Sequence, residues 1–598
     1  MAVITSAKTV GDLFLQRVEA TPDREALRRP TDAGWQSYTW SDVAGIVRPW
    51  AAGLLSLGIE REDRVALASS TRVDWIFADL AIMCSGAATT TIYPSTPAED
   101  VAYILNDSDT KILFVEDQAQ LDKVLSIREL VPGLTKVIII DGEGDGDFVL
   151  STADLTELGD KRLAKAPKIV DRAVKGTRAG GMATLMYTSG TTGRPKGVHL
   201  THANWVYEAT AMDSVGFLTD ETVGFLWLPL SHSFGKVLEC GSLAIGYPMA
   251  VDGRLEKVVE NLGDVKPHWT AAVPRIFEKV HGTVKSQVEA DGGIKQLLFN
   301  WAFGVGDTVA RNRREGKGTD PLTSVQHVLA DRLVLSKVRD RMGGNLEYFV
   351  SGAAPLSKDV AEWFDAAGLP ILEGYGLTET SAFSFVTRPG EYRFGTVGKP
   401  APGTKVKIAG DGEILLKGPG VMQGYHNLPE LTTEVFTDGW FHTGDIGEIT
   451  EEGDLRITDR KKDLIKTSGG KYVAPQSIES KFKAVCPYAS QIVVHGDGRN
   501  FVSALVTLDP QSIEAWAEGA GLAGKSYAEI ASSPQAHAMV AEHIEQLNAA
   551  LPRWETVKKF AVLTDDLSVE SGELTPSLKV KRKVVERKHI DVLDGFYS

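Results

Sequence analysis

Residues 188–198 read TSGTTGRPKGV and directly follow an apolar run, MATLMY, at 182–187. The apolar run predicts a strand, and the residues after the loop predict a helix. Glycines let the backbone approach a ligand closely, while hydroxyl, amide and ammonium groups can donate to phosphate oxygens. The loop therefore predicts a polyphosphate site made by Thr188, Ser189, Gly190, Thr191, Thr192, Gly193 and Lys196.

The spacing of this loop differs from that of the common P-loop. The pattern GxxxxGK[ST] is absent, so the loop does not predict the machinery of kinases and GTPases. A cluster of Ser, Thr and Gly is also found in loops that are merely solvated. The loop is thus either a different phosphate site or an ordinary surface connection.

Length and composition predict a soluble protein of more than one domain. The chain has 598 residues, of which 43% are hydrophobic and 24% are charged. This length exceeds what a single core usually supports, and the composition is that of ordinary globular proteins.

The charge balance argues against nucleic acid as a partner. The formal net charge is −15, whereas nucleic-acid binding depends on basic patches. One basic run, KVKRKVVERK at 579–588, is either a headgroup or nucleic-acid patch or a solvated charged face.

Cysteine usage and the absence of apolar spans predict a cytoplasmic protein. Cys84, Cys240 and Cys486 show no metal-binding spacing and cannot all pair, which suits a reducing compartment. The first residues lack the pattern of a secretory signal. The longest apolar stretch, 75–88, contains Asp79 and is too short to span a bilayer.

The order of apolar patterns predicts an α/β body followed by a smaller unit. Strand-like runs at 65–68, 112–115 and 137–140 alternate with helical patterns such as 43–57. Residues 276–338 predict a long helical segment, and 410–457 predict short strands with Asp-Gly turns at 411–412 and 438–439. The charged segment 457–466 is interpreted as a linker. We place a boundary at Lys462, between domains 1–461 and 462–598.

Several motifs together resemble those of the acyl-adenylate-forming enzymes, a superfamily that includes acyl-CoA synthetases, peptide-synthetase adenylation domains and luciferases. Besides the first loop, EGYGLTET at 373–380 and LTPSLKVKR at 574–582 carry this resemblance. The segment DGWFHTGDIGEITEEGDLRITDRKKDLIK at 438–466 resembles the signature of fatty acyl-CoA synthetases. The helical segment resembles that of long-chain synthetases and hints at a large apolar substrate, although simple packing also explains its apolar stripe. The resemblance implies a large N-terminal ATP- and acyl-binding domain and a small, mobile α+β C-terminal lid.

The resemblance also implies roles for residues in these motifs. Tyr375 would stack on adenine, Thr378 would contact the α-phosphate, and Glu379 with Thr188 would hold Mg²⁺. Asp445 and Arg460 would bind the ribose, Lys462 would act as the hinge, and Gly469 would leave room for the pantetheine arm of CoA, although a plain turn also explains that glycine. The remaining predicted nucleotide contacts are Gly352, Ala353, Ala354, Glu373, Gly374 and Gly376.

Two residues are predicted to act on the reacting groups. The resemblance places Lys579 against both the carboxylate and the α-phosphate, with Leu578 where relatives usually have glycine; Lys581 and Lys583 are the alternatives in register. His232 follows an apolar strand and would lie beside the acyl carbonyl, unless it is a core histidine. Positioning is favoured over general-base catalysis, because a carboxylate is already ionised at neutral pH.

The sequence therefore predicts a magnesium-dependent long-chain fatty acid:CoA ligase. ATP and a fatty acid would give acyl-AMP and pyrophosphate, and CoA would then displace AMP. Two alternatives stay open: a fatty acyl-AMP ligase that loads a carrier protein, and a non-catalytic acyl-adenylate sensor. The expected partners are fatty acid, ATP and CoA, without nucleic acid or a transmembrane segment, and a peripheral membrane contact is left open.

Overall fold

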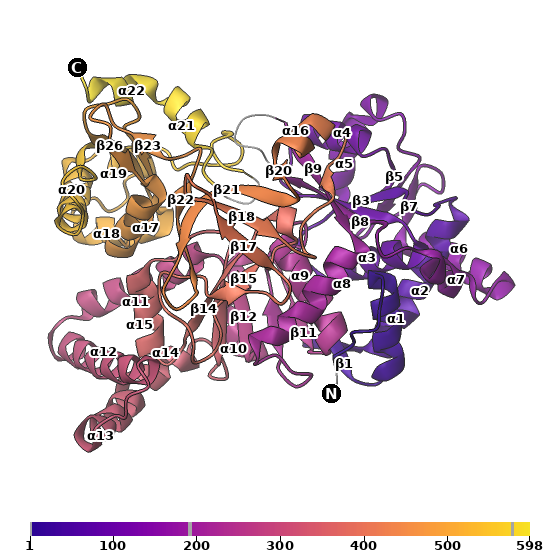
Figure 1. The fold of residues 1–598 in the computed structure, drawn as a ribbon, viewed down its shortest axis with the longest axis horizontal. Helices are drawn as coiled ribbons and strands as arrows, with labels where there is room; N and C mark the ends of the chain where they lie inside the picture. Colours follow the sequence, from indigo (N-terminus) through magenta and orange to yellow (C-terminus); the bar gives the residue numbers. More distant parts are fainter. Residues whose placement is uncertain (1–2, 189–193, 576–578) are drawn as a thin grey trace.

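The protein consists of two bodies with separate hydrophobic cores (Figure 1). The computed structural model describes residues 3–188, 194–575 and 579–598. The larger body runs from α1 (Val10–Ala20) to β22 (Leu455–Arg460), and the smaller one follows it. This α/β body with a small α+β C-terminal unit confirms the predicted fold class.

An eight-stranded sheet carries the N-terminal part of the larger body. Six neighbouring strands, which run in space from β8 at one end to β7 at the other, are parallel. At the edge beyond β8, strands β9 and β19 pair antiparallel. The predicted strands at 65–68 and 112–115 are confirmed, and that at 137–140 is found one residue earlier. In spatial order the strands are β19 (Gly424–Tyr425), β9 (Lys196–Thr201), β8 (Met182–Thr188), β4 (Ala88–Ile92), β3 (Arg64–Ala68), β5 (Thr110–Val115), β6 (Lys136–Ile139) and β7 (Val149–Ser151).

A nine-stranded sheet forms the second layer. Its central strands, from β14 to β1, are parallel. In spatial order the strands are β16 (Lys399–Pro400), β15 (Phe385–Val386), β14 (Ile371–Tyr375), β13 (Tyr348–Ser351), β12 (Trp269–Ala272), β10 (Gly224–Leu226), β11 (Met249–Val251), β1 (Glu25–Thr31) and β2 (Gly34–Thr39).

Helices shared by the two sheets make one continuous core. Twelve of the thirteen residues of α3 (Val73–Ser85) are buried, and so are twelve of the thirteen in α9 (Ser233–Ile245). Helices buried on nearly every side lie inside a domain rather than on its surface. The predicted helix at 43–57 is α2 (Trp40–Ser56), which packs on α3 and α6 (Thr152–Lys165).

A five-stranded antiparallel sheet completes the larger body and confirms the β-rich segment. It contains β17 (Lys405–Ile408), β18 (Glu413–Lys417), β20 (Phe436–Thr437), β21 (Trp440–Ile449) and β22. The turn Asp438-Gly439 joins β20 to β21 with φ angles of 52° and 74°. Positive φ at both positions is what a two-residue hairpin requires.

The smaller body is a three-stranded sheet covered by helices. Strands β25 (Ala489–His495), β26 (Val502–Leu508) and β27 (Val557–Val562) pack against α17 (Pro475–Val485) and α20 (Pro534–Ala549). The basic run at 579–588 enters α21 (Arg582–Lys588), where Arg582 pairs with Glu479 at 2.8 Å and Lys588 pairs with Glu573 at 2.9 Å. Part of this run is therefore structural.

The long helical segment is confirmed as α11 (Pro274–Asp291), α12 (Gly293–Arg314), α13 (Pro321–Ala330), the π-helical turn η4 (Asp331–Leu335) and α14 (Ser336–Asp340). Simple packing explains only part of its apolar stripe. Val305 is buried, but Leu297 and Trp301 are 70% and 37% exposed.

Two local predictions were wrong. The loop at 189–195 leads into strand β9, not a helix, and α8 (His202–Ala211) begins only at 202. The run KGVHLT is too short and polar to predict a strand by itself, but it pairs with β8 on one side and β19 on the other. The presumed linker 457–466 is largely strand, since it holds the end of β22 and β23 (Ile465–Lys466).

Candidate active site

The two ends of the predicted phosphate loop lie directly opposite each other. Thr188 ends β8, Lys196 begins β9, and the two are paired in the antiparallel register. The ammonium of Lys196 lies 5.6 Å from the centre of the Tyr425 ring. The predicted contacts Ser189, Gly190, Thr191, Thr192 and Gly193 lie outside the described residues.

Tyr425 also fixes the predicted metal ligand. Its hydroxyl donates to Oε1 of Glu379 at 2.8 Å, and the backbone N–H of Met422 donates to the carbonyl of Glu379 at 2.9 Å. Thr378, one residue earlier, is buried with its hydroxyl 3.5 Å from that of Ser233. Strand β19, which pairs with β9, is thus tied to the segment that carries Thr378 and Glu379.

Three residues distant in the sequence form one polar cluster. The hydroxyl of Tyr375 donates to Oδ2 of Asp445 at 2.6 Å, and Nε of Arg460 lies 3.2 Å from Oδ1 of the same carboxylate. Asp445 is 3% exposed, and its burial raises the pKa of its carboxyl group, an effect that the charge of Arg460 opposes. The register of β21 and β22 aligns Asp445 with Arg460. The cluster therefore presents hydroxyl, carboxylate and guanidinium groups to one ligand.

Small residues line the pocket beside this cluster. Gly352, Ala353, Gly374 and Gly376 line the same pocket as Tyr375. A Cβ atom at Gly376 would lie 1.8 Å from the carbonyl oxygen of Ala382, so only glycine fits there.

Of the six predicted contacts at 352–354, 373, 374 and 376, two lie outside the set that lines this pocket. Ala354 is exposed, and Glu373 is buried in β14, where its Oε1 accepts a bond from the N–H of Gly395 at 3.4 Å. Burial raises the pKa of Glu373 to about 8.

His232 caps the N-terminus of α9 at the edge of the pocket. Its Nδ1 accepts a bond from the N–H of Phe234 at 3.1 Å, so the neutral ring carries its hydrogen on Nε2. Desolvation, with a smaller repulsion from Lys579, lowers the pKa of His232 to about 3. The ring is therefore neutral at physiological pH and suited to donate a hydrogen bond rather than to accept a proton.

A buried ion cluster anchors α9 one turn after His232. The ammonium of Lys236 contacts the carboxylate of Asp79 from α3 and lies 3.1 Å from Oε2 of Glu239. All three side chains are no more than 1% exposed. Because a buried charge is costly without partners, this cluster fixes α9 relative to α3.

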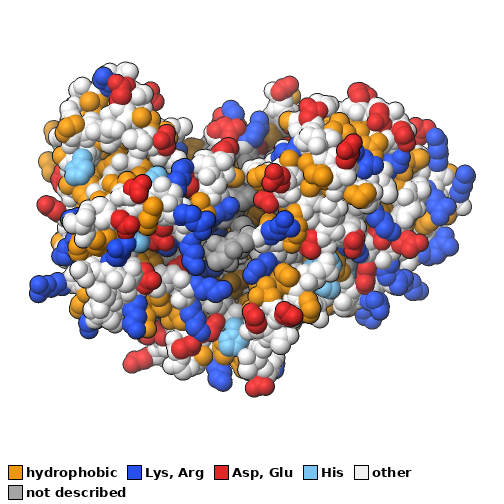
Figure 2. Space-filling view, turned by 90° about the horizontal axis from the view of Figure 1, so that it is seen from above, with side chains coloured by type: hydrophobic (Ala, Val, Ile, Leu, Met, Phe, Trp, Pro, Cys, Tyr) orange, Lys and Arg blue, Asp and Glu red, His pale blue; other side chains and the backbone are white. Residues whose placement is uncertain are grey.

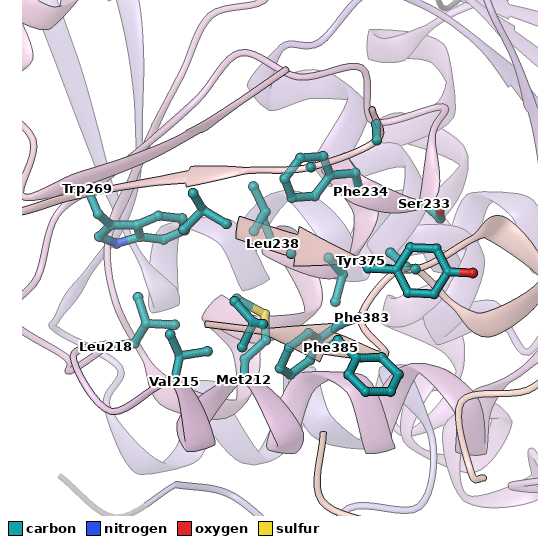
Figure 3. A pocket seen from close by; sticks show the side chains of 18 of the residues that line it. Met212, Val215, Leu218, Ser233, Phe234, Leu238, Trp269, Tyr375, Phe383 and Phe385 are labelled. Carbon is teal, nitrogen blue, oxygen red and sulfur yellow. The ribbon is translucent and has the colours of Figure 1, made fainter. Parts of the chain in front are cut away.

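An elongated apolar pocket extends from this region, with Tyr375 at one end and Trp269 at the other (Figure 3). The space among its lining residues, including the part open to solvent, is about 700 Å³. The far half is lined mainly by Met212, Val215, Phe217, Leu218, Leu238 and Trp269. Among the described residues, the helical insert contributes nothing to the lining of this pocket.

Trp269 closes the far end of the pocket. It is 2% exposed and makes edge contacts with Phe217 and Tyr247, at 6.2 and 5.3 Å between ring centres. A Cβ atom at Gly224 of the neighbouring strand would lie 2.8 Å from the indole. Gly224 therefore allows the indole to lie across β10.

Lys579 reaches this site from the smaller body. The N–H of Lys579 donates to the hydroxyl of Thr575 at 3.0 Å, and the N–H of Thr575 donates to the carbonyl of Lys579 at 2.8 Å. Its ammonium interacts electrostatically with Arg460, Asp445, Glu379 and His232. Figure 2 shows Lys and Arg side chains gathered along the hollow between the two bodies.

The environment of Lys579 lowers its pKa. The side chain of Lys579 is exposed to the open cleft, but the surrounding protein atoms displace part of the water around its ammonium group. This desolvation, with a smaller repulsion from Arg460, lowers the pKa of Lys579 to about 8.

Lys462 and Gly469 lie outside the cluster. Lys462 is exposed in the turn after β22, and Gly469 is exposed in the turn between β23 and β24 (Tyr472–Val473). The neighbouring Gly470 has a φ of 78°, which is typical of a turn. A plain turn was the alternative explanation for Gly469.

Sequence reasoning missed several residues of the site. Tyr425 forms a two-residue strand whose partner lies more than 200 residues earlier, so no local pattern marks it. Ser233 and Phe234 adjoin the predicted His232 and could have been included. The closure of the pocket by Trp269 depends on Gly224, a contact between strands.

Comparisons with known proteins cover nearly the whole chain. Residues 14–426 match the family of AMP-binding enzymes, and residues 462–598 match the AMP-binding enzyme C-terminal domain. The chain is 38% identical to the long-chain-fatty-acid–CoA ligase FadD15 of Mycobacterium bovis (strain ATCC BAA-935 / AF2122/97), over 98% of this chain and 97% of that protein. It is 31% identical to the long-chain-fatty-acid–CoA ligase ACSBG1 of Bos taurus, over 99% of this chain and 85% of that protein.

A solved structure shares the fold. The crystal structure of the anthranilate CoA ligase AuaEII in complex with anthranoyl-AMP superposes with a TM-score of 0.73, covering 97% of each chain at 20% sequence identity.

Proposed function

The chain belongs to the AMP-binding enzyme family, and from this membership we infer that it is a long-chain fatty acid–CoA ligase. It activates a fatty acid as its adenylate and transfers the acyl group to CoA. The observation that carries the site assignment is the position of Lys579. A cation from the smaller body lies among the Tyr375–Asp445–Arg460 cluster, Glu379 and His232, at the junction of the polar cleft and the apolar pocket.

We propose that the polar cluster binds the adenosine part of ATP. The ring of Tyr375 faces a pocket floored by glycines, where an adenine ring can lie flat. Asp445 would accept hydrogen bonds from the ribose hydroxyls, and Arg460 would hold this carboxylate and add a further ribose contact. The phosphates would then extend toward Thr378 and Lys196.

The acyl group would occupy the apolar pocket with its carboxylate near His232. Nε2–H of the neutral ring can donate to a carboxylate oxygen without competing for a proton. In the first half-reaction that oxygen attacks the α-phosphorus, the new P–O bond forms, and pyrophosphate leaves. The ammonium of Lys579 would stabilise the negative charge that develops on the phosphorus oxygens.

The donor set suits magnesium bound together with phosphate. Among the described residues, no cluster of three or more His, Cys, Asp or Glu side chains could enclose a metal ion. Mg²⁺ typically uses one or two carboxylates and completes its shell with phosphate oxygens and water. Glu379, oriented by Tyr425, and Thr188 would hold the ion. When bound, it would neutralise charge on the phosphates.

The second half-reaction requires Lys579 to leave. CoA sulfur attacks the acyl carbonyl, the thioester bond forms, and AMP departs, so the space beside the carbonyl must open. Lys461 is still held by the larger body, through Asp411 at 2.7 Å and Glu413 at 2.9 Å, whereas Ile465 is in the core of the smaller one. We propose that rotation occurs at Lys462 and brings Gly469 toward the acyl-adenylate to admit the pantetheine arm.

We propose a cytoplasmic enzyme with peripheral membrane contact. Cys84, Cys240 and Cys486 are free and buried, as suits a reducing compartment. In the part of the chain that the structure describes, no helix combines the length and apolar character needed to cross a bilayer.

Turnover with fatty acids of graded length tests the proposed function. Purified enzyme with ATP, Mg²⁺ and CoA is expected to release AMP and acyl-CoA in equal amounts. Without CoA it should release pyrophosphate from a single turnover and form neither AMP nor acyl-CoA. The kcat/KM should rise about fourfold for each added methylene until the tail reaches Trp269, since each buried methylene contributes about 0.8 kcal/mol. Turnover with an acyl carrier protein but not with CoA would instead identify a fatty acyl-AMP ligase.

Trp269→Ala is the matched variant for this series. Removing the indole lengthens the pocket, so the optimum is expected to shift to longer acids while shorter acids lose little. An unchanged optimum would show that the acyl chain does not extend toward Trp269.

The pKa of Lys579 predicts the pH dependence of adenylation. The protonated amine is the active form, and its pKa is lowered from 10.5 to about 8, so the charge is present below pH 8 and lost as the pH rises through that value. The kcat/KM for pyrophosphate release, which reports the free enzyme, should therefore fall above about pH 8. Lys579→Arg, which stays charged, should be slower but flat over the same range. A wild-type profile flat to pH 10 would contradict the assignment.

A further inference from the structure

Exposed apolar side chains are concentrated on the helical insert. Among the described residues, eighteen large hydrophobic side chains are exposed, and eight of them lie between 294 and 333. Such a concentration marks an interaction surface, whereas single exposed apolar residues need no explanation. The eight are Ile294, Leu297, Trp301, Leu322, Val325, Val328, Leu329 and Leu333, with exposed fractions of 84, 70, 37, 68, 61, 66, 51 and 44%.

These residues form stripes on two packed helices. Ile294, Leu297 and Trp301 follow helical spacing on α12, and the other five follow it on α13 and η4. The two helices pack on each other, and Figure 1 shows α13 at the tip of the molecule, away from both sheets. A surface helix normally turns its polar face to water, so α13 has the reverse arrangement.

The inner face of the insert is already packed, so the outer stripes are a permanent surface. Phe303 of α12 stacks on Trp363 of α15 (Lys358–Ala366) with 4.8 Å between ring centres, and Phe299 stacks on Phe303 at 4.4 Å. Arg313 and Arg314 both contact the buried carboxylate of Asp365. The helices are anchored to the body through this side, and the exposed stripes face away from it.

The insert is locally basic in an acidic protein. Residues 291–341 contain nine Lys and Arg against six Asp and Glu, while the whole chain has a formal net charge of −15. Six of the nine basic side chains are in ion pairs, those of Arg313 and Arg314 with Asp365 outside this range. Arg332 is exposed between Leu329 and Leu333 on the apolar face itself. Lys337 and Arg341 are also exposed on the insert, as is Lys295, whose ammonium lies 3.2 Å from Oδ2 of Asp291.

We propose that the outer face of α12, α13 and η4 binds the surface of an anionic lipid bilayer. Leu, Val and Trp side chains would enter the boundary between headgroups and acyl chains, and the basic side chains would contact anionic headgroups. A second copy of the chain fits this face less well, because the same basic face on each copy would repel the other. The inference names the surface that would make the peripheral membrane contact of the proposed function, and it does not depend on the ligase reaction.

Vesicle binding tests this proposal without turnover. Wild-type protein is expected to co-sediment with vesicles of phosphatidylcholine and phosphatidylglycerol, more weakly with phosphatidylcholine alone, and more weakly at high salt. The double variant Val325→Glu with Val328→Glu should lower the partition coefficient on anionic vesicles about a hundredfold, because two buried valines are lost. The matched control, Leu255→Glu with Val259→Glu, changes two residues elsewhere that are 53% and 61% exposed, and it should bind like wild type.

Activity and oligomeric state complete the test. Acyl-CoA formation from a soluble medium-chain acid should be equal in both double variants and wild type, which shows that the variants fold. Equal binding of the Val325/Val328 variant and wild type, or wild-type binding without preference for anionic lipid, would overturn the proposal. A wild-type dimer that this variant converts to a monomer, with vesicle binding unaffected, would identify the face as a contact between two copies.

Discussion

Replacing Lys579 by alanine is expected to slow acyl-AMP formation by about a hundredfold or more while leaving thioester formation from supplied acyl-AMP nearly intact. Removing one group that stabilises charge in a transition state costs about 3 kcal/mol in comparable sites, which corresponds to a loss of this size. The ammonium lies among Arg460, Asp445 and Glu379 in the present arrangement. In the second half-reaction it would have moved away with the smaller body, so its loss should not matter there.

The two half-reactions can be measured separately. Pyrophosphate release from ATP and palmitate reports the first, and acyl-CoA formation from synthetic palmitoyl-AMP and CoA reports the second. Lys583→Ala is the matched control, since Lys583 is exposed in the same basic run and should keep both rates. Equal loss of both half-reactions in Lys579→Ala would contradict the assignment. Loss of the first half-reaction in Lys583→Ala instead would show that Lys583, not Lys579, is the catalytic lysine.

Motif residues were predictable because each carries its chemistry in a short segment. Tyr375, Asp445, Arg460 and Lys579 lie in three motifs spread over roughly 200 residues, and the structure brings them into one cleft. Their roles in the reaction stay predictions, to be tested by the variants above. The strand run KGVHLT was missed because its strand character comes from β8 and β19 on either side, a long-range effect that overrides local propensity.

The walls of the site were less predictable than its chemical groups. Tyr425 orients Glu379 from a two-residue strand, and Trp269 closes the apolar pocket only because Gly224 leaves space for its indole. Contacts of this kind depend on which strands become neighbours in a sheet. In the helical insert, the apolar periodicity of the sequence predicted the helices. It did not predict that part of the apolar stripe would face solvent.

The smaller body is held in its present orientation by contacts with α11. Gly282 of α11 lies against Pro487 of the smaller body, and a Cβ atom at Gly282 would lie 3.1 Å from Cβ of Pro487. Around it lie three polar contacts: Arg275 with Ser490 at 3.0 Å, Lys279 with Gln511 at 2.8 Å and Glu278 with Lys483 at 3.3 Å. These contacts stabilise the arrangement in which Lys579 reaches the cleft.

A disulfide across this contact is expected to abolish acyl-CoA formation while a single adenylation proceeds. Cβ atoms joined by a disulfide are about 3.5–4.5 Å apart, so Gly282→Cys with Pro487→Cys needs an opening of only a few tenths of an ångström. Cys486→Ala in the same protein prevents the neighbouring thiol from competing. The oxidised enzyme should release one equivalent of pyrophosphate and then stop with acyl-AMP bound, because Lys579 can no longer withdraw.

Reduction supplies the internal control for this trap. Dithiothreitol should restore acyl-CoA formation in the same sample, and Gly282→Cys alone should respond to neither oxidant nor reductant. Unlike Lys579→Ala, which blocks the first step and spares the second, the disulfide spares the first and blocks the second. Because the two changes act on one moving lysine, opposite defects follow only if the smaller body serves the two steps in different orientations. A cross-linked enzyme that forms acyl-CoA at the reduced rate would show instead that thiol transfer occurs with Lys579 still in the cleft.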